Sequence, residues 1–172
     1  MKSIIFFTYA FVITFTLSIY CVRADFTAKV QRVVDGDTIH VVNKAGKKFK
    51  VRLTGIDAPE KNQPYGLAST YKLNEILINK WVLLISKPNN GNLYSIDRYN
   101  RILAKVIYDG RDINLLQVSR GYAWHFKRYQ KQQSSLDRES YSRAEIDAKK
   151  NELGLWGEKN PIAPWKWRKI KK

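Results

Sequence analysis

Three short groups of acidic and basic residues have the types and spacing needed for chemistry on phosphate. The first is Asp35-Gly36-Asp37, which lies between two β-rich segments. An Asp-Gly pair in such a place is typical of a hairpin turn, and a turn needs only one of the two aspartates. Asp37 opens the next predicted strand, where an acid has poor β propensity. For this motif alone, a turn and a metal ligand both stay open as interpretations.

The second group places an arginine before two carboxylates. Arg52 ends a predicted strand, and Asp57 and Glu60 follow in the next loop with a proline between them. If the strands pair, Asp37 and Asp57 approach each other at one end of the sheet. Two carboxylates, a backbone carbonyl such as that of Ala58, and water make an oxygen-rich site of the kind that Ca²⁺ or Mg²⁺ prefers.

The third group is the stretch Asp97-Arg98-Tyr99-Asn100-Arg101. Basic residues at the edge of a strand are usually solvated, so this stretch carries little weight by itself. A guanidinium group nevertheless matches two phosphate oxygens and stabilises the charge that develops on them during phosphoryl transfer. Arg52 and Arg101 near a carboxylate-bound cation therefore indicate cleavage of phosphodiesters.

Five predicted strands and three predicted helices would position these groups. The strands cover 26–34, 38–42, 48–53, 81–86 and 101–108, and the helices cover 66–80, a short segment capped by Asp112, and about 134–153. Three strands, a helix and two more strands are what a five-stranded, partly open barrel requires, and such barrels bind oligonucleotides on one face. The sequence therefore predicts one α+β domain over residues 25–157.

The composition favours a folded basic domain. The 172 residues include 31 Lys and Arg against 15 Asp and Glu, a formal charge of +16, which favours nucleic acid as a partner and anionic lipid second. An apolar fraction of 44% excludes a disordered polycation. Cys21 is the one cysteine, which excludes a disulfide framework and a CxxC-type zinc site. Residues 158–172, basic and containing two tryptophans, are expected to form a flexible tail.

Residues 1–24 have the pattern of a secretory signal peptide. Lys2 precedes an apolar run that ends at Tyr20, and Val22-Arg23-Ala24 is a small-x-small cleavage pattern. The run is at the short limit for a membrane span, so cleavage after Ala24 is favoured over an uncleaved anchor. We therefore expect a secreted or periplasmic protein.

The same motifs resemble the staphylococcal-type thermonucleases, also called micrococcal nucleases. The matching stretches are VVDGDTIHV (33–41), VRLTGIDAPE (51–60), YGLAS (65–69), DRYNRILAKVIYDG (97–110), INLLQVSRGYAW (113–124) and AKKNELGLW (148–156). They follow the order of the family and span most of the chain after residue 24. The resemblance implies an OB-fold barrel with packed helices, and Ca²⁺-dependent hydrolysis of DNA and RNA that leaves 3′-phosphate ends.

Carried over by position, the resemblance implies roles for nine residues. Asp37, Asp57 and the Ala58 carbonyl would bind calcium, Arg52, Glu60 and Arg101 would be catalytic, and Tyr99, Tyr129 and Lys127 would line the substrate pocket. The best-known member has threonine in place of Ala58 and tyrosine in place of Lys127. The calcium ligand is a backbone oxygen, so the first exchange should be tolerated, while the second bears on substrate preference. We expect a monomer that prefers single-stranded or unpaired regions.

Two other functions stay open. A non-catalytic nucleic-acid-binding module on the same barrel would need the basic surface, but it has no use for two aspartates, a glutamate and two arginines together. A membrane-bound adhesin would explain the first 20 residues but not the acids. The nuclease is therefore the leading hypothesis.

Overall fold

A meander of three antiparallel strands opens the part of the chain that the structure describes. The computed structural model covers residues 25–89 and 91–170, and the predicted signal peptide and its cleavage site lie outside these described residues. The strands are β1 (Phe26–Asp35), β2 (Thr38–Asn43) and β3 (Lys48–Leu53), and β2 pairs with both others. Side chains alternate across a strand, so Ile39 and Val41 face the core while His40 lies on the outer face.

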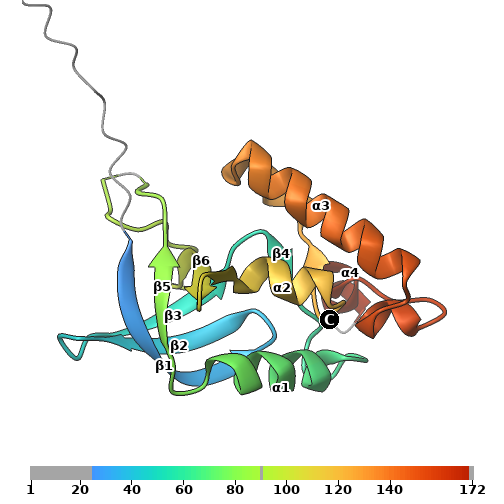
Figure 1. Cartoon of the computed structure of the whole chain (residues 1–172), viewed down its shortest axis with the longest axis horizontal. Helices are drawn as coiled ribbons and strands as arrows, with labels where there is room; N and C mark the ends of the chain where they lie inside the picture. Colours follow the sequence, from blue (N-terminus) through green and yellow to red (C-terminus); the bar gives the residue numbers. More distant parts are fainter. Residues whose placement is uncertain (1–24, 90, 171–172) are drawn as a thin grey trace, which may run out of the picture.

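Two further strands close the meander into a barrel (Figure 1). β5 (Trp81–Ile85) pairs antiparallel with β1, and β6 (Ile102–Tyr108) pairs antiparallel with β5. β6 also pairs in parallel with β3, where Val51 lies opposite Ile102, and this pairing joins the two ends of the sheet. The predicted five-stranded barrel of the α+β class is confirmed, and it is closed by the β3–β6 pairing rather than partly open.

Helices pack around this barrel in the order that the sequence predicts. They are α1 (Gly66–Leu77), α2 (Ile113–Ser119) and α3 (Ser135–Lys150). α1 lies against β1, and α2 lies between β6 and α3 (Figure 1). The predicted caps are present, because the Asp112 side chain accepts a hydrogen bond from the Leu115 N–H and the Ser134 side chain accepts one from the Asp137 N–H. Over residues 25–89 and 91–170, no helix is long and apolar enough to cross a membrane.

Short elements complete the fold. They are β4 (Ile56–Asp57), β7 (Arg111–Asp112), β8 (Trp124–His125) and two 3₁₀ segments, η1 (Lys127–Gln132) and η2 (Gly154–Gly157). β4 pairs with β8, so that Asp57 lies opposite Trp124. The loop that carries Asp57 is therefore tied to the segment that leads into η1.

Two buried amides on α2 fix the turns that carry the candidate residues. Asn114 donates to the carbonyl oxygens of Thr54 (2.9 Å) and Ala104 (3.2 Å), which joins the β3–β4 turn to β6. Gln117 donates to the carbonyl oxygen of Gly36 (2.9 Å) in the β1–β2 turn. Leaving a buried polar group without its partner costs about 1–3 kcal/mol, so these bonds hold both turns strongly.

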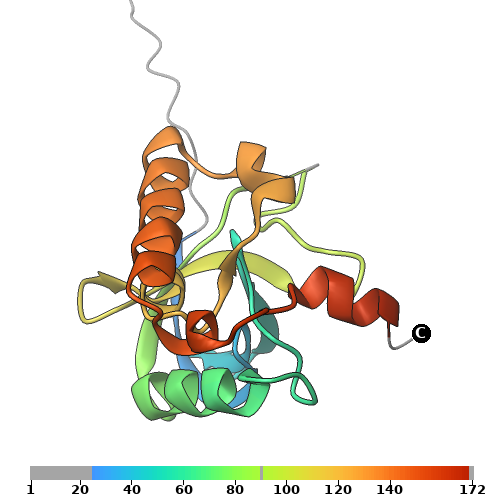
Figure 2. The ribbon, with the colours of Figure 1, turned by 90° about the vertical axis from the view of Figure 1, so that its right-hand side faces the viewer.

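The C-terminal segment differs from the expected flexible tail. Residues Pro164–Ile170 form a helix, α4, which projects from one side of the molecule (Figure 2). The ring of Trp165 lies 5.4 Å from the ring of Trp124 and 5.3 Å from that of Phe126. Aromatic side chains bury large areas in such pairs, and this gain orders a segment whose composition alone is polar.

Candidate active site

Two buried carboxylates lie together where β2 begins and β4 ends. Asp37 is 5% exposed and Asp57 is 1% exposed. Nη2 of Arg52 lies 3.0 Å from Oδ2 of Asp37 and 2.9 Å from Oδ1 of Asp57, so one guanidinium joins the two acids. The structure thus brings together three of the residues that the sequence singles out.

The Asp37 carboxylate is held in place by its neighbours. Its Oδ2 accepts the backbone N–H of Ala58 (2.8 Å), and its Oδ1 accepts the hydroxyl of Thr38 (3.0 Å). Gly36 permits this packing, because a Cβ there would lie 1.8 Å from Oγ of Ser69 and 2.7 Å from Cβ of Ala58. Only glycine allows the β1–β2 turn to approach the Asp57 loop so closely.

Burial sets the electrostatics of these acids. Burial raises the pKa of the Asp57 carboxyl above its ordinary value, the hydrogen bond from Arg168 opposes this, and the charge of Asp37 adds to it. Asp35, whose Oδ1 accepts the Asp37 N–H (3.0 Å), has its pKa raised to about 7 by burial and by the charge of Asp37. Buried negative charges of this kind require a positive partner close by.

Arg101 directly precedes β6 and approaches the carboxylate pair from the β6 side of the β3–β6 pairing. Asp97 lies 2.8 Å from Nε and 2.7 Å from Nη2 of Arg101, and Nη1 lies 3.5 Å from Oγ1 of Thr38, the residue that contacts Asp37. Arg98 and Arg101 both lie over the ring of Tyr99, which is 60% exposed. Arg101 and Tyr99 therefore belong to the same site as the carboxylate pair.

Glu60 stands at the solvent side of the site. Its backbone N–H donates to Oε1 of Gln63 (3.1 Å), and its carbonyl oxygen accepts the Gln63 N–H (2.8 Å), which fixes the loop before α1. The Glu60 side chain is 38% exposed, and its Oε1 lies 2.7 Å from Nη1 of Arg168. The Glu60 carboxylate is therefore open to solvent, whereas Asp37 and Asp57 are buried.

The oxygen atoms of the site are of the kind that a hard cation requires. Over the described ranges, 25–89 and 91–170, no group of three or more His, Cys, Asp or Glu side chains is arranged to hold a metal ion. The site offers two carboxylates, which already converge on one positive charge, the Arg52 guanidinium. With the Ala58 carbonyl and water as further oxygen donors, the residues present fit a hard divalent cation such as Ca²⁺ or Mg²⁺.

The two remaining candidates lie on η1, and their contacts are with α3 and with Phe126 rather than with the carboxylate pair. The Lys127 ammonium pairs with Oε2 of Glu145 on α3 (3.1 Å). The Tyr129 ring is 50% exposed and packs 5.4 Å from the ring of Phe126. Phe126 in turn contacts Trp165 of α4, so η1 borders the site through aromatic contacts rather than through a charged group.

Two residues of the site have no role in the sequence prediction. Asp97 orients Arg101, and its spacing of four residues from that arginine was a usable signal for an ion pair. Arg168 contacts both Asp57 and Glu60 from α4, within the segment expected to be flexible. Two tryptophans around a basic residue indicate a packed segment as well as a solvated one, but nothing local identifies partners more than a hundred residues away.

Comparisons with known proteins agree with the motifs and the barrel. The model of the family described as staphylococcal nuclease homologue matches residues 50–158. A Haemophilus influenzae protein named as an uncharacterized endonuclease is 39% identical over 158 residues, which cover 92% of this chain and 82% of that protein. The micrococcal nuclease of Shigella flexneri is 36% identical over 159 residues, which cover 87% of this chain and 84% of that protein. The predicted resemblance and the OB-fold are thereby confirmed, and the chain belongs to the staphylococcal nuclease family.

Proposed function

We propose that the protein is a Ca²⁺-dependent nuclease that hydrolyses phosphodiester bonds of DNA and RNA, leaves 3′-phosphate ends, and acts outside the cytoplasm after removal of residues 1–24. The observation that carries the proposal is the buried Asp37–Asp57 pair joined by Arg52, with Glu60 and Arg101 beside it. A protein that only binds nucleic acid has no need to bury two like charges at such a cost.

The residues divide the chemistry between them. Asp37, Asp57 and the Ala58 carbonyl would hold Ca²⁺, which supplies positive charge against the phosphate oxygens. The exposed carboxylate of Glu60 takes a proton from the water whose oxygen bonds to phosphorus, the P–O5′ bond breaks, and the leaving 5′-oxygen takes up a proton from solvent. Arg52 and Arg101 donate to the phosphoryl oxygens, where negative charge grows in the transition state.

Arg101 is oriented for such a role before substrate arrives. Asp97 binds its Nε and Nη2 along one edge of the guanidinium, and its Nη1 lies at the Thr38 side, near the carboxylate pair. An arginine fixed by a second carboxylate loses little rotamer freedom when it binds a phosphate, which favours catalysis over loose attraction.

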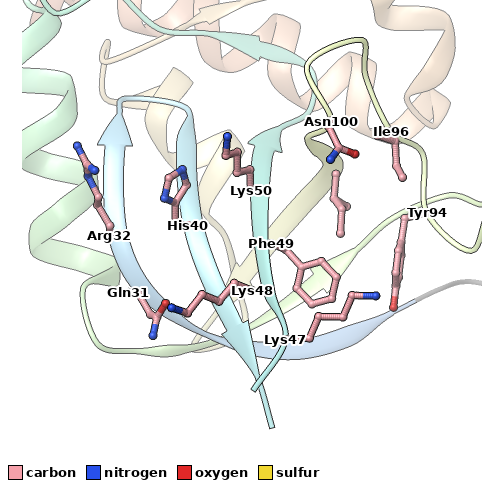
Figure 3. Close-up of a pocket in the computed structure, with 11 residues that line it drawn as sticks. Gln31, Arg32, His40, Lys47, Lys48, Phe49, Lys50, Tyr94, Ile96 and Asn100 are labelled. Carbon is pink, nitrogen blue, oxygen red and sulfur yellow. The ribbon is translucent and has the colours of Figure 1, made fainter. Parts of the chain in front are cut away.

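A basic groove supports a polynucleotide as the substrate. The groove has a volume of about 760 Å³ and runs over the outer face of β1, β2 and β3. Figure 3 shows Arg32, His40 and Lys50 side by side across the three strands, with Phe49 and Tyr94 beyond them. Thr38 pairs with Arg52 and His40 with Lys50, so the groove begins one pleat away from Arg52. Basic side chains beside aromatic faces suit a single strand of nucleic acid.

The test is hydrolysis of single-stranded DNA, double-stranded DNA and RNA with Ca²⁺, with Mg²⁺, and with a chelator. We expect cleavage that requires Ca²⁺ and products that end in 3′-phosphate. Glu60→Gln should lower turnover by about 10²–10⁴ while DNA binding persists, because it removes the group assigned to the water. Glu139→Gln, at a 73% exposed position on α3, is the matched control and should cleave normally.

A different result would favour the alternative function. A parent protein that binds DNA but cleaves no polymer under any of these conditions would be a non-catalytic binding module on the same barrel. Equal turnover in the parent and in Glu60→Gln would leave a nuclease but move the base to another residue.

A further inference from the structure

Arg168 of α4 places its guanidinium against two acids of the candidate site, Asp57 and Glu60. Its Nη2 lies 2.7 Å from Oδ2 of Asp57, and its Nη1 lies 3.3 Å from Oδ1 of Asp57 and 2.7 Å from Oε1 of Glu60. The guanidinium therefore forms a two-pronged contact with Asp57 and a third bond with Glu60. Such contacts are among the strongest that an arginine makes.

The segment that leads up to Arg168 packs on the protein at three residues. Trp165 packs on Trp124 and Phe126, and Nε1 of Trp167 donates to Oδ1 of Asn62 (3.3 Å). Just before the helix, Nε2 of Gln63 donates to the carbonyl oxygen of Ile162. Asn62 and Gln63 belong to the same loop as Glu60, so α4 packs beside the candidate site.

Arg168 uses the same oxygens that a divalent cation needs. Oδ1 of Asp57 is already shared with Arg52, and Oδ2 of Asp57 is taken by Arg168. A guanidinium and a divalent cation on one carboxylate also repel each other, because both are positive and the Asp57 side chain between them is 2% exposed. Arg168 and a cation would therefore compete for Oδ2 of Asp57.

We propose that α4 is an intramolecular inhibitor in which the Arg168 guanidinium and the divalent cation exclude each other at Asp57. The proposal rests on the proposed function, because it takes Asp57 as a cation ligand. The same contact ties up Glu60, since a carboxylate that accepts a hydrogen bond from a guanidinium is a weaker acceptor for the proton of water. A cation that binds Asp57 thus displaces Arg168 and releases the Glu60 carboxylate in one step.

The experiment measures Ca²⁺ affinity by calorimetry on the parent protein, Arg168→Gln and Lys169→Gln. Lys169 is the matched control, because it is an exposed charge one residue further along the same helix. We expect Arg168→Gln to bind Ca²⁺ about tenfold or more tightly, in line with the effect of removing a bonded charge from a carboxylate. Lys169→Gln should stay within about twofold of the parent, which corrects for net charge.

A second measurement follows the helix itself. Hydrogen exchange of the backbone amides of 165–170 should accelerate in the parent when Ca²⁺ is added, because the cation displaces Arg168. Trp165→Ala, which keeps Arg168 but removes the packing on Trp124 and Phe126, should also tighten Ca²⁺ binding. Tighter Ca²⁺ binding in this variant would support the proposal without any change of charge at the site.

The outcomes separate this proposal from the proposed function. Equal Ca²⁺ affinity in the parent and Arg168→Gln, with unchanged exchange in α4, would overturn the inhibitor and leave the Ca²⁺-dependent nuclease intact. Lower affinity in Arg168→Gln would overturn it too and make Arg168 a supporting residue of the cation site. Failure of every variant to bind Ca²⁺ would reject the cation site and the inhibitor together.

Discussion

Three arginines serve the candidate site, and they differ in what holds them. Arg52 is 13% exposed and lies between two aspartates, so its position follows from the barrel. Arg101 is held by Asp97, which belongs to the turn before β6. Arg168 is held by the site itself, through Asp57 and Glu60. At the scale of single residues, Arg52 and Arg101 are fixed by the fold, whereas Arg168 is the group that we propose a cation displaces.

The metal role and the charge-stabilising role can be separated by titration with calcium. Asp37→Ala removes an oxygen donor, so the variant should need far more Ca²⁺, and excess metal should recover part of its activity. Arg101→Ala removes a donor to the phosphate, so turnover should fall by about 10²–10³ and extra Ca²⁺ should recover nothing. The measurement is the initial rate of DNA hydrolysis against Ca²⁺ concentration for each variant.

The conservative exchange Arg101→Lys sharpens that comparison. A point charge cannot reproduce a contact made along the edge of a guanidinium, so this variant should also stay slow. If calcium restores Arg101→Ala as readily as Asp37→Ala, the two residues do not have separate roles.

Stability should depend on pH through His125. This side chain is 2% exposed, its Nε2 bonds Oε1 of Gln133 (3.0 Å), and its Nδ1 has no hydrogen-bond partner within the described residues. Burial lowers the pKa of His125, the Gln133 bond and the charge of Glu145 oppose this, and Lys127 adds to it. A lowered pKa means that the unfolded chain takes up the proton first, so the free energy of unfolding falls as pH drops below about 6.5.

The check is urea unfolding of the parent and His125→Gln between pH 5 and 8. The parent should lose stability relative to the variant as the pH falls, with a limiting slope of about 1.4 kcal/mol per pH unit. The difference between the two proteins cancels the titration of Asp35 and His40, which both retain. Parallel curves would mean that His125 titrates alike in the folded and unfolded chain.

At the scale of elements, local patterns predicted more than contacts between distant segments. The strands, the helix order and the caps at Asp112 and Ser134 depend on side chains within a few residues, and all are confirmed. The parallel β3–β6 pairing and the ordered α4 depend on contacts across much of the chain, which periodicity does not report. For the site, the same limit explains why the sequence predicts Arg52 and Arg101 as candidates but not Arg168, whose contacts lie more than a hundred residues away.

The first turn of α1 should control the position of Glu60. A Cβ on Gly66 would lie 1.8 Å from the carbonyl oxygen of Glu60, a backbone atom that cannot move without moving the loop. Gly66→Ala should therefore cost about 1–3 kcal/mol in the free energy of unfolding and also slow hydrolysis. Urea unfolding and the rate of DNA cleavage measure the two effects.

Leu67→Ala is the control for this variant, because it changes the same turn at a side chain that is 69% exposed. It should leave both quantities nearly unchanged. A Gly66→Ala protein with parental stability and rate would show that the Glu60 loop is not braced by α1.

At the scale of the molecule, a chain of net charge +16 has four Lys and Arg side chains lining the groove, namely Arg32, Lys47, Lys48 and Lys50. If a strand of nucleic acid follows the groove, replacing Lys48 and Lys50 by glutamine should raise the KM for long single-stranded DNA. The KM for a dinucleotide substrate should stay unchanged. The dependence of log KM on log salt should also weaken by roughly 0.7 for each lost phosphate contact. Steady-state kinetics at several ionic strengths measure both.

The control is the pair Lys80→Gln and Lys150→Gln, two exposed lysines that do not line the groove. They remove the same charge elsewhere on the surface. An equal change of KM in both double variants would point to overall attraction, and a change in the dinucleotide reaction would place the groove lysines in the chemistry.

The parallel pairing that closes the barrel also has a consequence for the order of folding. Val51 and Ile102 meet across 51 positions of the chain, and closing a long loop costs entropy before its contacts form. We therefore expect β1, β2 and β3 to assemble early and β6 to dock late. In refolding from urea, recovery of hydrolysis should lag behind the first β-sheet signal, and simultaneous recovery would contradict this order.

Arg52 lies on β3, whereas Arg101 directly precedes β6, so the two arginines stand on opposite sides of that late seam. A nascent or half-folded chain would already carry Asp37 and Arg52 on the early meander, but it would not yet hold Arg101 beside them. The proposed nuclease activity would then arise only in the fully folded molecule. The order of assembly would itself protect the nucleic acids of the cell that synthesises the chain.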